Sequence, residues 1–140
     1  MANTSLDPSQ ILYSAATLRS TSWNGMLIGN ELDAYVNNSL DIGAIPPLPV
    51  TQRNNQWVTK NNRRLWICRH LKRLGKLSLV RVKIDNQFVP NSMLNTITII
   101  GHIGGQWAFH GQNDSSLLEG LTVTGVLGIL GFVLLRALFR

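Results

Sequence analysis

The segment Thr59-Lys-Asn-Asn-Arg-Arg-Leu-Trp-Ile-Cys-Arg-His-Leu-Lys-Arg-Leu-Gly75 decides how this chain folds. Asn61 or Asn62 can cap a helix there, because an asparagine side-chain oxygen accepts a hydrogen bond from a free backbone N–H group. Gly75 suits the left-handed conformation of the residue just past a helix end. The segment therefore predicts a helix over 61–75.

The two sides of this expected helix differ in charge. At helical spacing, one side carries Arg64, Ile67, Leu71 and Leu74, and the other carries a basic row made of Arg69, Lys72, Arg73 and Lys76. Arg64 falls in the first turn beside free N–H groups, and the two together make an anion site. The basic row can hold phosphates, lipid head groups or a protein partner, or it can be a solvated face.

Patterns on either side of this helix predict an α+β fold. Strands are expected at 10–14, 47–51, 56–59, 78–84, 87–89 and 95–100, with Asn54-Asn55 as a hairpin turn. A second helix is expected over Glu31–Leu40, where Asn30 is a cap and one face carries Leu32, Tyr35, Val36 and Leu40. We expect a loose N-terminus over 1–9 and a domain over 10–100, with a mixed sheet and two or three helices.

The last part of the chain differs in kind. Residues 101–116 are rich in glycine and predict a linker or an ordered loop outside the core. From Leu121 to Leu135 no residue is charged, which predicts a single transmembrane helix over 117–139. A buried helix of a soluble domain is the alternative. Gly125, Gly128 and Gly131 would let this helix pack closely on another, or would only make it more flexible.

The charge of the chain is concentrated in one block. The net charge is +6, and ten of the thirteen basic residues lie between Arg53 and Lys83, where no acidic residue occurs. Such a block suits nucleic acid, a nucleotide, anionic lipid or an acidic protein partner. Cys68 is the only cysteine, so no disulfide within the chain and no cysteine zinc site is expected. The N-terminus lacks the basic region of a secretory signal, and the single Arg19 before Arg53 is unlike a presequence.

One pattern resembles a known family. The order is Ile45-Pro-Pro-Leu-Pro-Val50, then Trp57-Val-Thr-Lys-Asn-Asn-Arg-Arg-Leu-Trp66, then Leu71-Lys-Arg-Leu-Gly75 and a Val/Ile strand. It is similar to the ParB/sulfiredoxin-like fold, above all to a divergent subgroup with an Asn-Arg-Arg-Leu motif, and it covers residues 10–84. The resemblance implies that a strand-to-helix turn holds a nucleotide phosphate with Asn61, Asn62, Arg63 and Arg64.

The chain departs from that family at the residues that carry its chemistry. Sulfiredoxins have their catalytic cysteine where this chain has Asn62, and ParB proteins have a glycine where it has Asn61. Nothing after Ile84 resembles the ParB helix that binds CTP and metal, or its DNA-reading helix-turn-helix module. The resemblance therefore implies the fold and an anion pocket, and these departures indicate that the pocket is vestigial.

These observations predict a non-enzymatic accessory subunit of a larger membrane protein complex, without cofactor or metal. The expected partners are other subunits, the lipid bilayer, and an anionic ligand or phospholipid head group. Nucleic acid is a less favoured partner. A short span followed by Arg136 and Arg140 favours a mitochondrial membrane. The alternative is a membrane-tethered nucleotide- or nucleic-acid-binding module that uses the Asn-Arg-Arg motif. A ParB-like hydrolase ranks below both, because no metal-binding carboxylate cluster is visible and the histidines lack ligand spacing: His70, His102 and His110.

Overall fold

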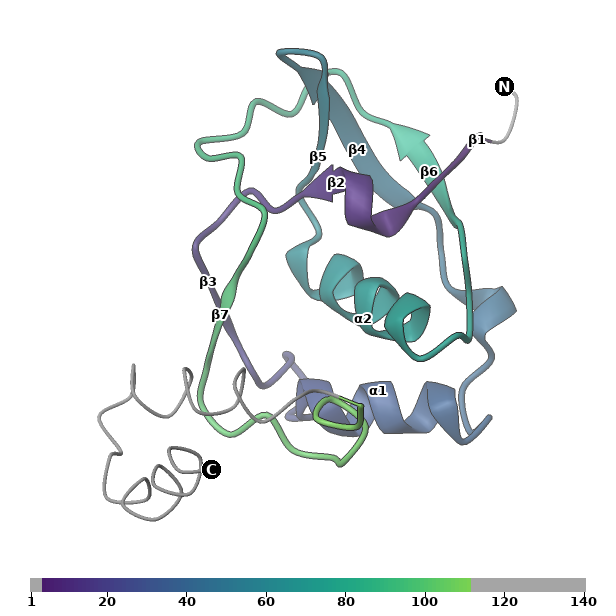
Figure 1. The fold of residues 1–140 in the computed structure, drawn as a ribbon. Helices are drawn as coiled ribbons and strands as arrows, with labels where there is room; N and C mark the ends of the chain where they lie inside the picture. The colour runs from purple at the N-terminus through teal and green to yellow at the C-terminus, as the bar shows by residue number, and fades with distance from the viewer. Residues whose placement is uncertain (1–3, 112–140) are drawn as a thin grey trace, which may run out of the picture. The chain divides into compact units, whose positions relative to one another are not determined.

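Helix α2 (Asn62–Arg73) lies between the main sheet and helix α1 (Ile28–Val36) in the computed structural model (Figure 1). The structure describes residues 4–111, of which 4–108 belong to one compact unit. Its other elements are β1 (Thr4–Leu6), η1 (Pro8–Gln10), β2 (Ile11–Leu12), β3 (Thr17–Arg19), η2 (Ile42–Ala44), β4 (Leu48–Arg53), β5 (Gln56–Thr59), β6 (Val80–Ile84) and β7 (Thr98–Ile100), where η is a 3-10 helix. This part of the chain is α+β, as predicted, with a mixed sheet and two α-helices.

The predicted helix forms at α2, and both of its ends are closed by hydrogen bonds. The Asn61 side chain accepts from the backbone N–H of Arg64 at 3.0 Å, which confirms Asn61 as the N-cap. At the other end Gly75 has a φ of +75°, and the N–H groups of Gly75 and Lys76 donate to Lys72 and Leu71. This pair of bonds is a Schellman motif, which satisfies carbonyls that the helix itself leaves free.

Helix α2 is buried on more than one side. Four consecutive residues, Leu65 to Cys68, are buried, and so is Leu71. A helix on a protein surface buries only one stripe, whereas four buried residues in a row cover more than one turn. Here the sheet lies on one side of α2 and α1 on another, whereas Arg73 and Lys76 of the basic row are exposed (Figure 1).

The main sheet has the strand order β1-β6-β4-β5-β2. β4 and β5 form the predicted antiparallel hairpin, in which Asn54 and Asn55 have φ values of +54° and +64°. Two successive positive φ angles are typical of the tight turns that match the twist of a hairpin. β6 pairs parallel with β4, and its buried Val80 and Val82 alternate with exposed Arg81 and Lys83, which confirms a half-buried strand.

Helix α1 begins earlier than predicted. It runs over Ile28–Val36, so Asn30 lies inside the helix and the prediction that it is the cap was wrong. The N-cap position is Leu27, which makes no side-chain capping bond. Tertiary packing explains the difference, because Ile28 and Gly29 are buried and the Gly29 N–H donates to Ile103 at 2.7 Å. Leu40 was expected on the inner face but lies beyond the helix and is partly exposed.

Three further expectations differ from the structure. The N-terminus is not loose from residue 4 onward, because β1 pairs antiparallel with β6 and η1 follows. Residues 87–89 form no strand, and Val89 is exposed. Two short strands, β3 and β7, pair parallel in a separate sheet, where only the second was predicted.

The glycine-rich segment is ordered over 101–108 and packs on α1. Asp33 accepts hydrogen bonds from the N–H groups of Gln106 and Trp107, and Ala108 belongs to the core. The described part is an ordered loop, but the prediction that it lies outside the core was wrong, because Ile103 and Trp107 also pack against the core and the compact unit extends to Ala108. The expected transmembrane helix, with Gly125, Gly128 and Gly131, lies outside the described residues. Within them, no helix has the length and apolar character that crossing a bilayer requires.

The contact between α1 and this loop gives a test of the fold. A Cβ atom on Gly29 would lie 1.9 Å from the backbone oxygen of Gly104, so Gly29→Ala forces two backbone segments apart. We expect the free energy of unfolding to fall by about 3 kcal/mol, as for a severe overpacking change.

Gly25→Ala is the matched control. Gly25 has a φ of +86° but nothing within 4 Å of the added atom, so only backbone strain is introduced. Its expected cost is about 1 kcal/mol. Urea unfolding of both variants measures the difference, and equal stabilities would contradict the packing of the 101–108 loop on α1.

Candidate functional site

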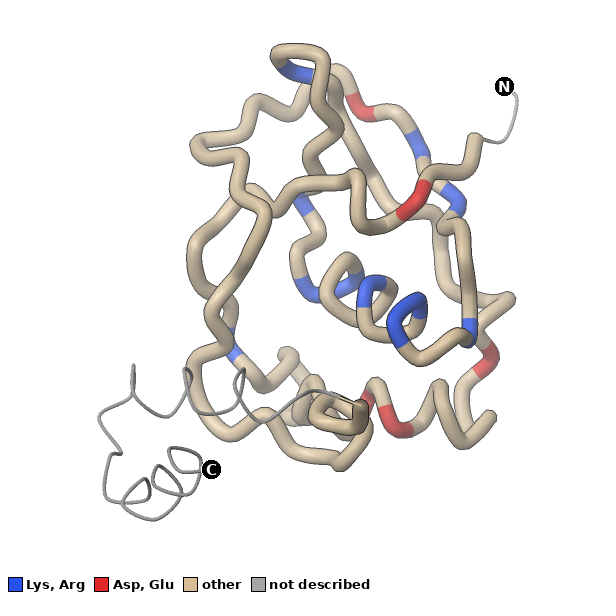
Figure 2. Tube along the Cα trace, viewed as in Figure 1, with Lys and Arg blue, Asp and Glu red and all other residues tan. Residues whose placement is uncertain are grey.

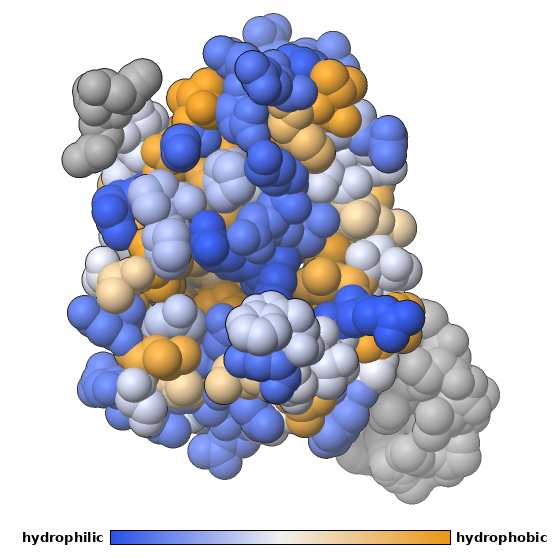
Figure 3. Space-filling model, turned by 180° about the vertical axis from the view of Figure 1, so that it is seen from behind, coloured by the Kyte–Doolittle hydropathy of each residue, from blue (hydrophilic) through white to orange (hydrophobic). Residues whose placement is uncertain are grey.

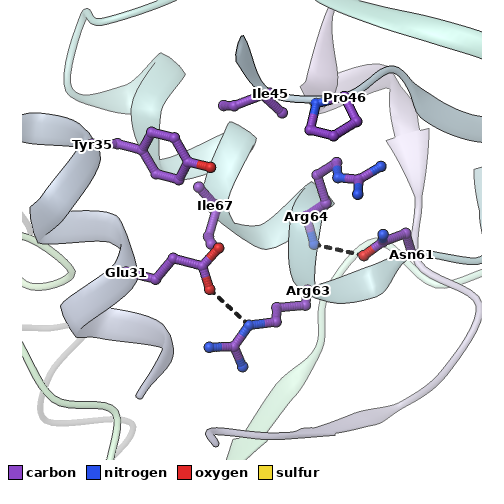
Figure 4. Close-up of a pocket in the computed structure, with 8 residues that line it drawn as sticks. All are labelled: Glu31, Tyr35, Ile45, Pro46, Asn61, Arg63, Arg64 and Ile67. Atoms are coloured by element: carbon purple, nitrogen blue, oxygen red, sulfur yellow. Dashed lines mark hydrogen bonds and ion pairs between the residues drawn. The ribbon is translucent and has the colours of Figure 1, made fainter. Parts of the chain in front are cut away.

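The predicted phosphate-binding turn is present, but Arg63 uses its side chain within the domain. Its Nε donates to Glu31 Oε1 at 2.9 Å, and the two Nη atoms donate to the backbone oxygens of Ser20 and Met26 at 3.0 and 2.9 Å. The side chain is 18% exposed, and Glu31 comes from α1 (Figure 4). Arg63 therefore joins α2 to α1 and to the loop at residues 20–26.

Asn62 is also engaged by the chain itself. Its Oδ1 accepts from the backbone N–H of Ser14 at 2.9 Å, and its Nδ2 donates to the hydroxyl of Ser14 at 3.2 Å. This side chain fixes the segment after β2 against the first turn of α2. At the position of the sulfiredoxin cysteine, the structure therefore has an amide that holds a neighbouring loop.

Arg64 lines a small pocket at the start of α2. The pocket has a volume of about 160 Å³ and is lined by Glu31, Tyr35, Ile45, Pro46, Asn61, Arg63, Arg64 and Ile67 (Figure 4). Arg64 donates from Nη1 to the backbone oxygen of Pro47 at 3.1 Å and is partly exposed. Burial, and then the charge of Glu31, raise the pKa of Tyr35, so its phenol is a neutral donor at the wall of the pocket.

The size and charge of this pocket limit what it can take. Pockets for drug-sized ligands have volumes of about 300–1,000 Å³, so this one has room for a phosphate or carboxylate group but not for a whole nucleotide. The carboxylate of Glu31 would repel an anion, although Arg63 pairs with it. Glu31 and Tyr35 were not among the predicted site residues, because only the packing of α1 on α2 brings them here.

The basic row makes contacts inside the domain at three of its four positions. Arg69 donates from Nε to the backbone oxygen of Pro8 at 3.1 Å, from Nη1 to that of Asn95 at 2.6 Å, and from Nη2 to that of Ile11. Its guanidinium also lies 4.6 Å from the centre of the Tyr13 ring, which is a cation–π distance. Arg69 thus connects the N-terminal segment and residue 95 to α2.

Lys72 and Arg73 contact two further segments. Lys72 Nζ lies 2.7 and 2.8 Å from the two carboxylate oxygens of Asp7, just before η1. Arg73 donates from Nη2 to the backbone oxygens of Trp107 and Ala108 at 2.9 and 3.1 Å. Lys76 is exposed beyond the helix end.

Burial keeps the other titratable groups of α2 uncharged at neutral pH. It lowers the pKa of His70 to about 4, with a smaller effect from the charge of Arg73, and Arg73 Nε donates to His70 Nδ1 at 3.2 Å. Burial raises the pKa of Cys68 to about 11, so its thiol is not a nucleophile at neutral pH. Among residues 4–111, no three His, Cys, Asp or Glu side chains are placed to hold a metal ion.

Along the trace, the basic residues of α2 follow one another, and the acidic residues of the described chain lie on other segments (Figure 2). Most of the side-chain partners of these residues are backbone carbonyls, although Arg63 also pairs with Glu31 and Lys72 with Asp7. The use of these residues for a ligand, lipid or partner protein stays a prediction.

In comparisons with known proteins, no family model, no curated protein and no solved structure matches the chain. The resemblance to the ParB/sulfiredoxin-like fold therefore stays a prediction from the motif residues.

The ion pair between Lys72 and Asp7 predicts a specific pH dependence. Hydrogen bonds from Lys72 and Ser9 lower the pKa of Asp7 from 3.8 to about 2. A carboxyl group whose pKa is lower in the folded state stabilises that state above the unfolded pKa, and this stabilisation is lost as the pH falls through the folded value. The difference in the free energy of unfolding between the wild type and Asp7→Asn should have its full size above pH 3.8. It should vanish as the pH falls through about 2.

Urea unfolding at a series of pH values measures this difference, and Lys72→Met should remove the same pH dependence. The control is Lys76→Met, at an exposed position beyond the end of α2, which should leave the dependence unchanged. A difference that persists undiminished at pH 2 would contradict the pairing.

Proposed function

We propose that this chain is a non-enzymatic accessory subunit of a larger membrane protein complex, held in a mitochondrial membrane by its C-terminal segment. One observation carries the proposal. Arg63, Arg69 and Arg73 donate to carbonyls of four segments of their own domain. A guanidinium group that recognises a ligand needs donors directed at the ligand, whereas these donors hold the domain together.

The composition of the C-terminal segment supports the membrane part of this proposal. Residues 121–135 contain no charged side chain, and Arg136 and Arg140 follow. A run of this kind is close to the length that spans the hydrocarbon core of a bilayer, about 20 residues. The segment lies outside the described residues, so its sequence alone supports this part.

The small pocket at Arg64 favours an alternative, a membrane-tethered module that binds the phosphate of a nucleotide or nucleic acid. Arg64 lines the pocket and donates from one Nη group to the backbone oxygen of Pro47. The free N–H groups of the first helical turn, which follows the Asn61 cap, lie nearby. The carboxylate of Glu31 and the volume of about 160 Å³ weigh against a large anion in this pocket. A wider depression of about 470 Å³ is lined by Lys60, Asn61, Asn62 and Arg63, but the Arg63 side chain is held by Glu31, Ser20 and Met26. We therefore place this function second.

The test is purification of the full chain from its native membranes in mild detergent. The accessory-subunit proposal predicts recovery in a large assembly, with the same co-purifying chains at constant stoichiometry in independent preparations. A stable monomer in detergent, without stoichiometric partners, would contradict it. Extraction of the chain from membranes by salt or alkali alone would contradict the membrane anchor.

Arg64→Ala separates the two functions in the same preparation. If the chain is an accessory subunit, the variant changes the yield of folded or assembled protein, and neither the wild type nor the variant binds ATP, CTP or DNA in a salt-dependent way. If the alternative holds, the wild type binds one of these and the variant does not.

A further inference from the structure

Trp23 is the most exposed large hydrophobic residue of the described chain. Its side chain is 97% exposed, whereas Trp57, Trp66 and Trp107 are buried or partly buried in the core. An indole ring in water contributes nothing to folding, and tryptophan is enriched where proteins meet partners or membrane interfaces. The position of Trp23 therefore needs an explanation outside the folded core.

The loop that carries Trp23 is held in one conformation by its own hydrogen bonds. The Ser22 N–H donates to Met26 at 3.0 Å, and the Gly25 N–H donates to Ser22 at 2.9 Å. The Asn24 side chain accepts from the Met26 N–H at 3.2 Å and from the Ser22 hydroxyl. Gly25, with a φ of +86°, supplies the turn that an L side chain rarely adopts. The ring is therefore presented on an ordered turn.

Arg63 fixes the base of the same loop. Its two Nη atoms donate to Ser20 and Met26, one on each side of Trp23, and its Nε is paired with Glu31. Thr21 and Leu27 form an antiparallel bridge beside these bonds. The arginine of the predicted phosphate motif is thus a positioning residue for an exposed tryptophan.

The residues around Trp23 form a mixed apolar and basic surface. Arg19, Thr21 and Trp23 are exposed and the residues between them are less exposed, over the stretch where the end of β3 leads into the turn that carries Trp23. Ile100, 52% exposed, pairs with Arg19 across the β3–β7 ladder, and Met26 is 40% exposed. We call these five residues the Trp23 patch.

The charge of the Trp23 patch is positive. Arg19 belongs to none of the ion pairs in the described part of the chain, and Glu31, at the base of the loop, is already paired with Arg63. Seen from behind, hydrophobic residues on the surface are scattered among hydrophilic ones (Figure 3). A projecting tryptophan next to an unpaired arginine matches an interface that is apolar inside and negatively charged outside.

We propose that the Trp23 patch inserts into the head-group region of an anionic lipid bilayer. Tryptophan prefers this region because its ring is apolar and its N–H is polar, and Arg19 would meet the lipid phosphates. A turn that projects into a bilayer needs no matching pocket, whereas a protein partner would have to provide one. The inference rests on the proposed membrane placement.

Fluorescence quenching by lipids tests this inference with the full chain. The chain is reconstituted into vesicles of phosphatidylcholine and phosphatidylserine, with and without dibrominated phosphatidylcholine, and flotation measures how much of it is bound. We expect brominated lipid to quench the wild type and to lose most of that effect in Trp23→Phe. The matched control, Trp57→Phe at a half-buried position of β5, should keep the quenching.

The outcomes separate this inference from the proposed function. A chain that does not float contradicts both. If the chain floats but quenching is the same in the wild type and in Trp23→Phe, the lipid contact is overturned and the proposed function is not. The Trp23 patch would then be assigned to a protein partner. Arg19→Gln should reduce the quenching on vesicles with phosphatidylserine and leave it unchanged on phosphatidylcholine alone. An equal effect on both vesicles would contradict the charge contribution.

Discussion

Hydrogen bonds from the arginine side chains of α2 to backbone carbonyls are the interaction on which the rest of this domain depends. Arg69 binds the segment around η1 and residue 95, Arg63 binds both sides of the 20–26 loop, and Arg73 binds the 107–108 loop. A carbonyl that is withdrawn from water without gaining a donor is costly. A planar guanidinium can satisfy two or three carbonyls at once, which an ammonium group cannot do in the same fixed geometry.

This arrangement gives the basic block of the sequence a structural explanation. A concentration of positive charge without acids is first interpreted as a surface for nucleic acid or lipid. In this domain α2 carries five of the thirteen basic residues and lies between the sheet and α1, and its Arg69 and Arg73 side chains donate to surrounding loops. The positive charge of Arg19, in contrast, lies on the surface beside Trp23. The Trp23 patch is therefore a better candidate for contact with lipid or a partner protein than the larger basic row.

Elements with a strong local pattern could be predicted from the sequence, and elements held by distant contacts could not. The Asn61 cap and Gly75 mark α2, two asparagines mark the β4–β5 hairpin, and alternation marks β6. The start of α1, by contrast, depends on Gly29 packing against Gly104, and β1 exists only through its pairing with β6. The site followed the same rule: the position of Arg63 at the first turn was predictable, but its partners on α1 and the 20–26 loop were not.

The most direct test of this account is the stability of Arg69→Lys, which keeps the charge but loses the guanidinium fork. If Arg69 holds the Pro8–Ile11 segment and Asn95, chemical unfolding of the full chain should show a loss of about 3 kcal/mol. Arg19→Lys, at an exposed position without an ion pair in the described chain, should change the stability by less than about 0.5 kcal/mol. Equal stabilities of the two variants would mean that only the charge of Arg69 matters, and would contradict the account.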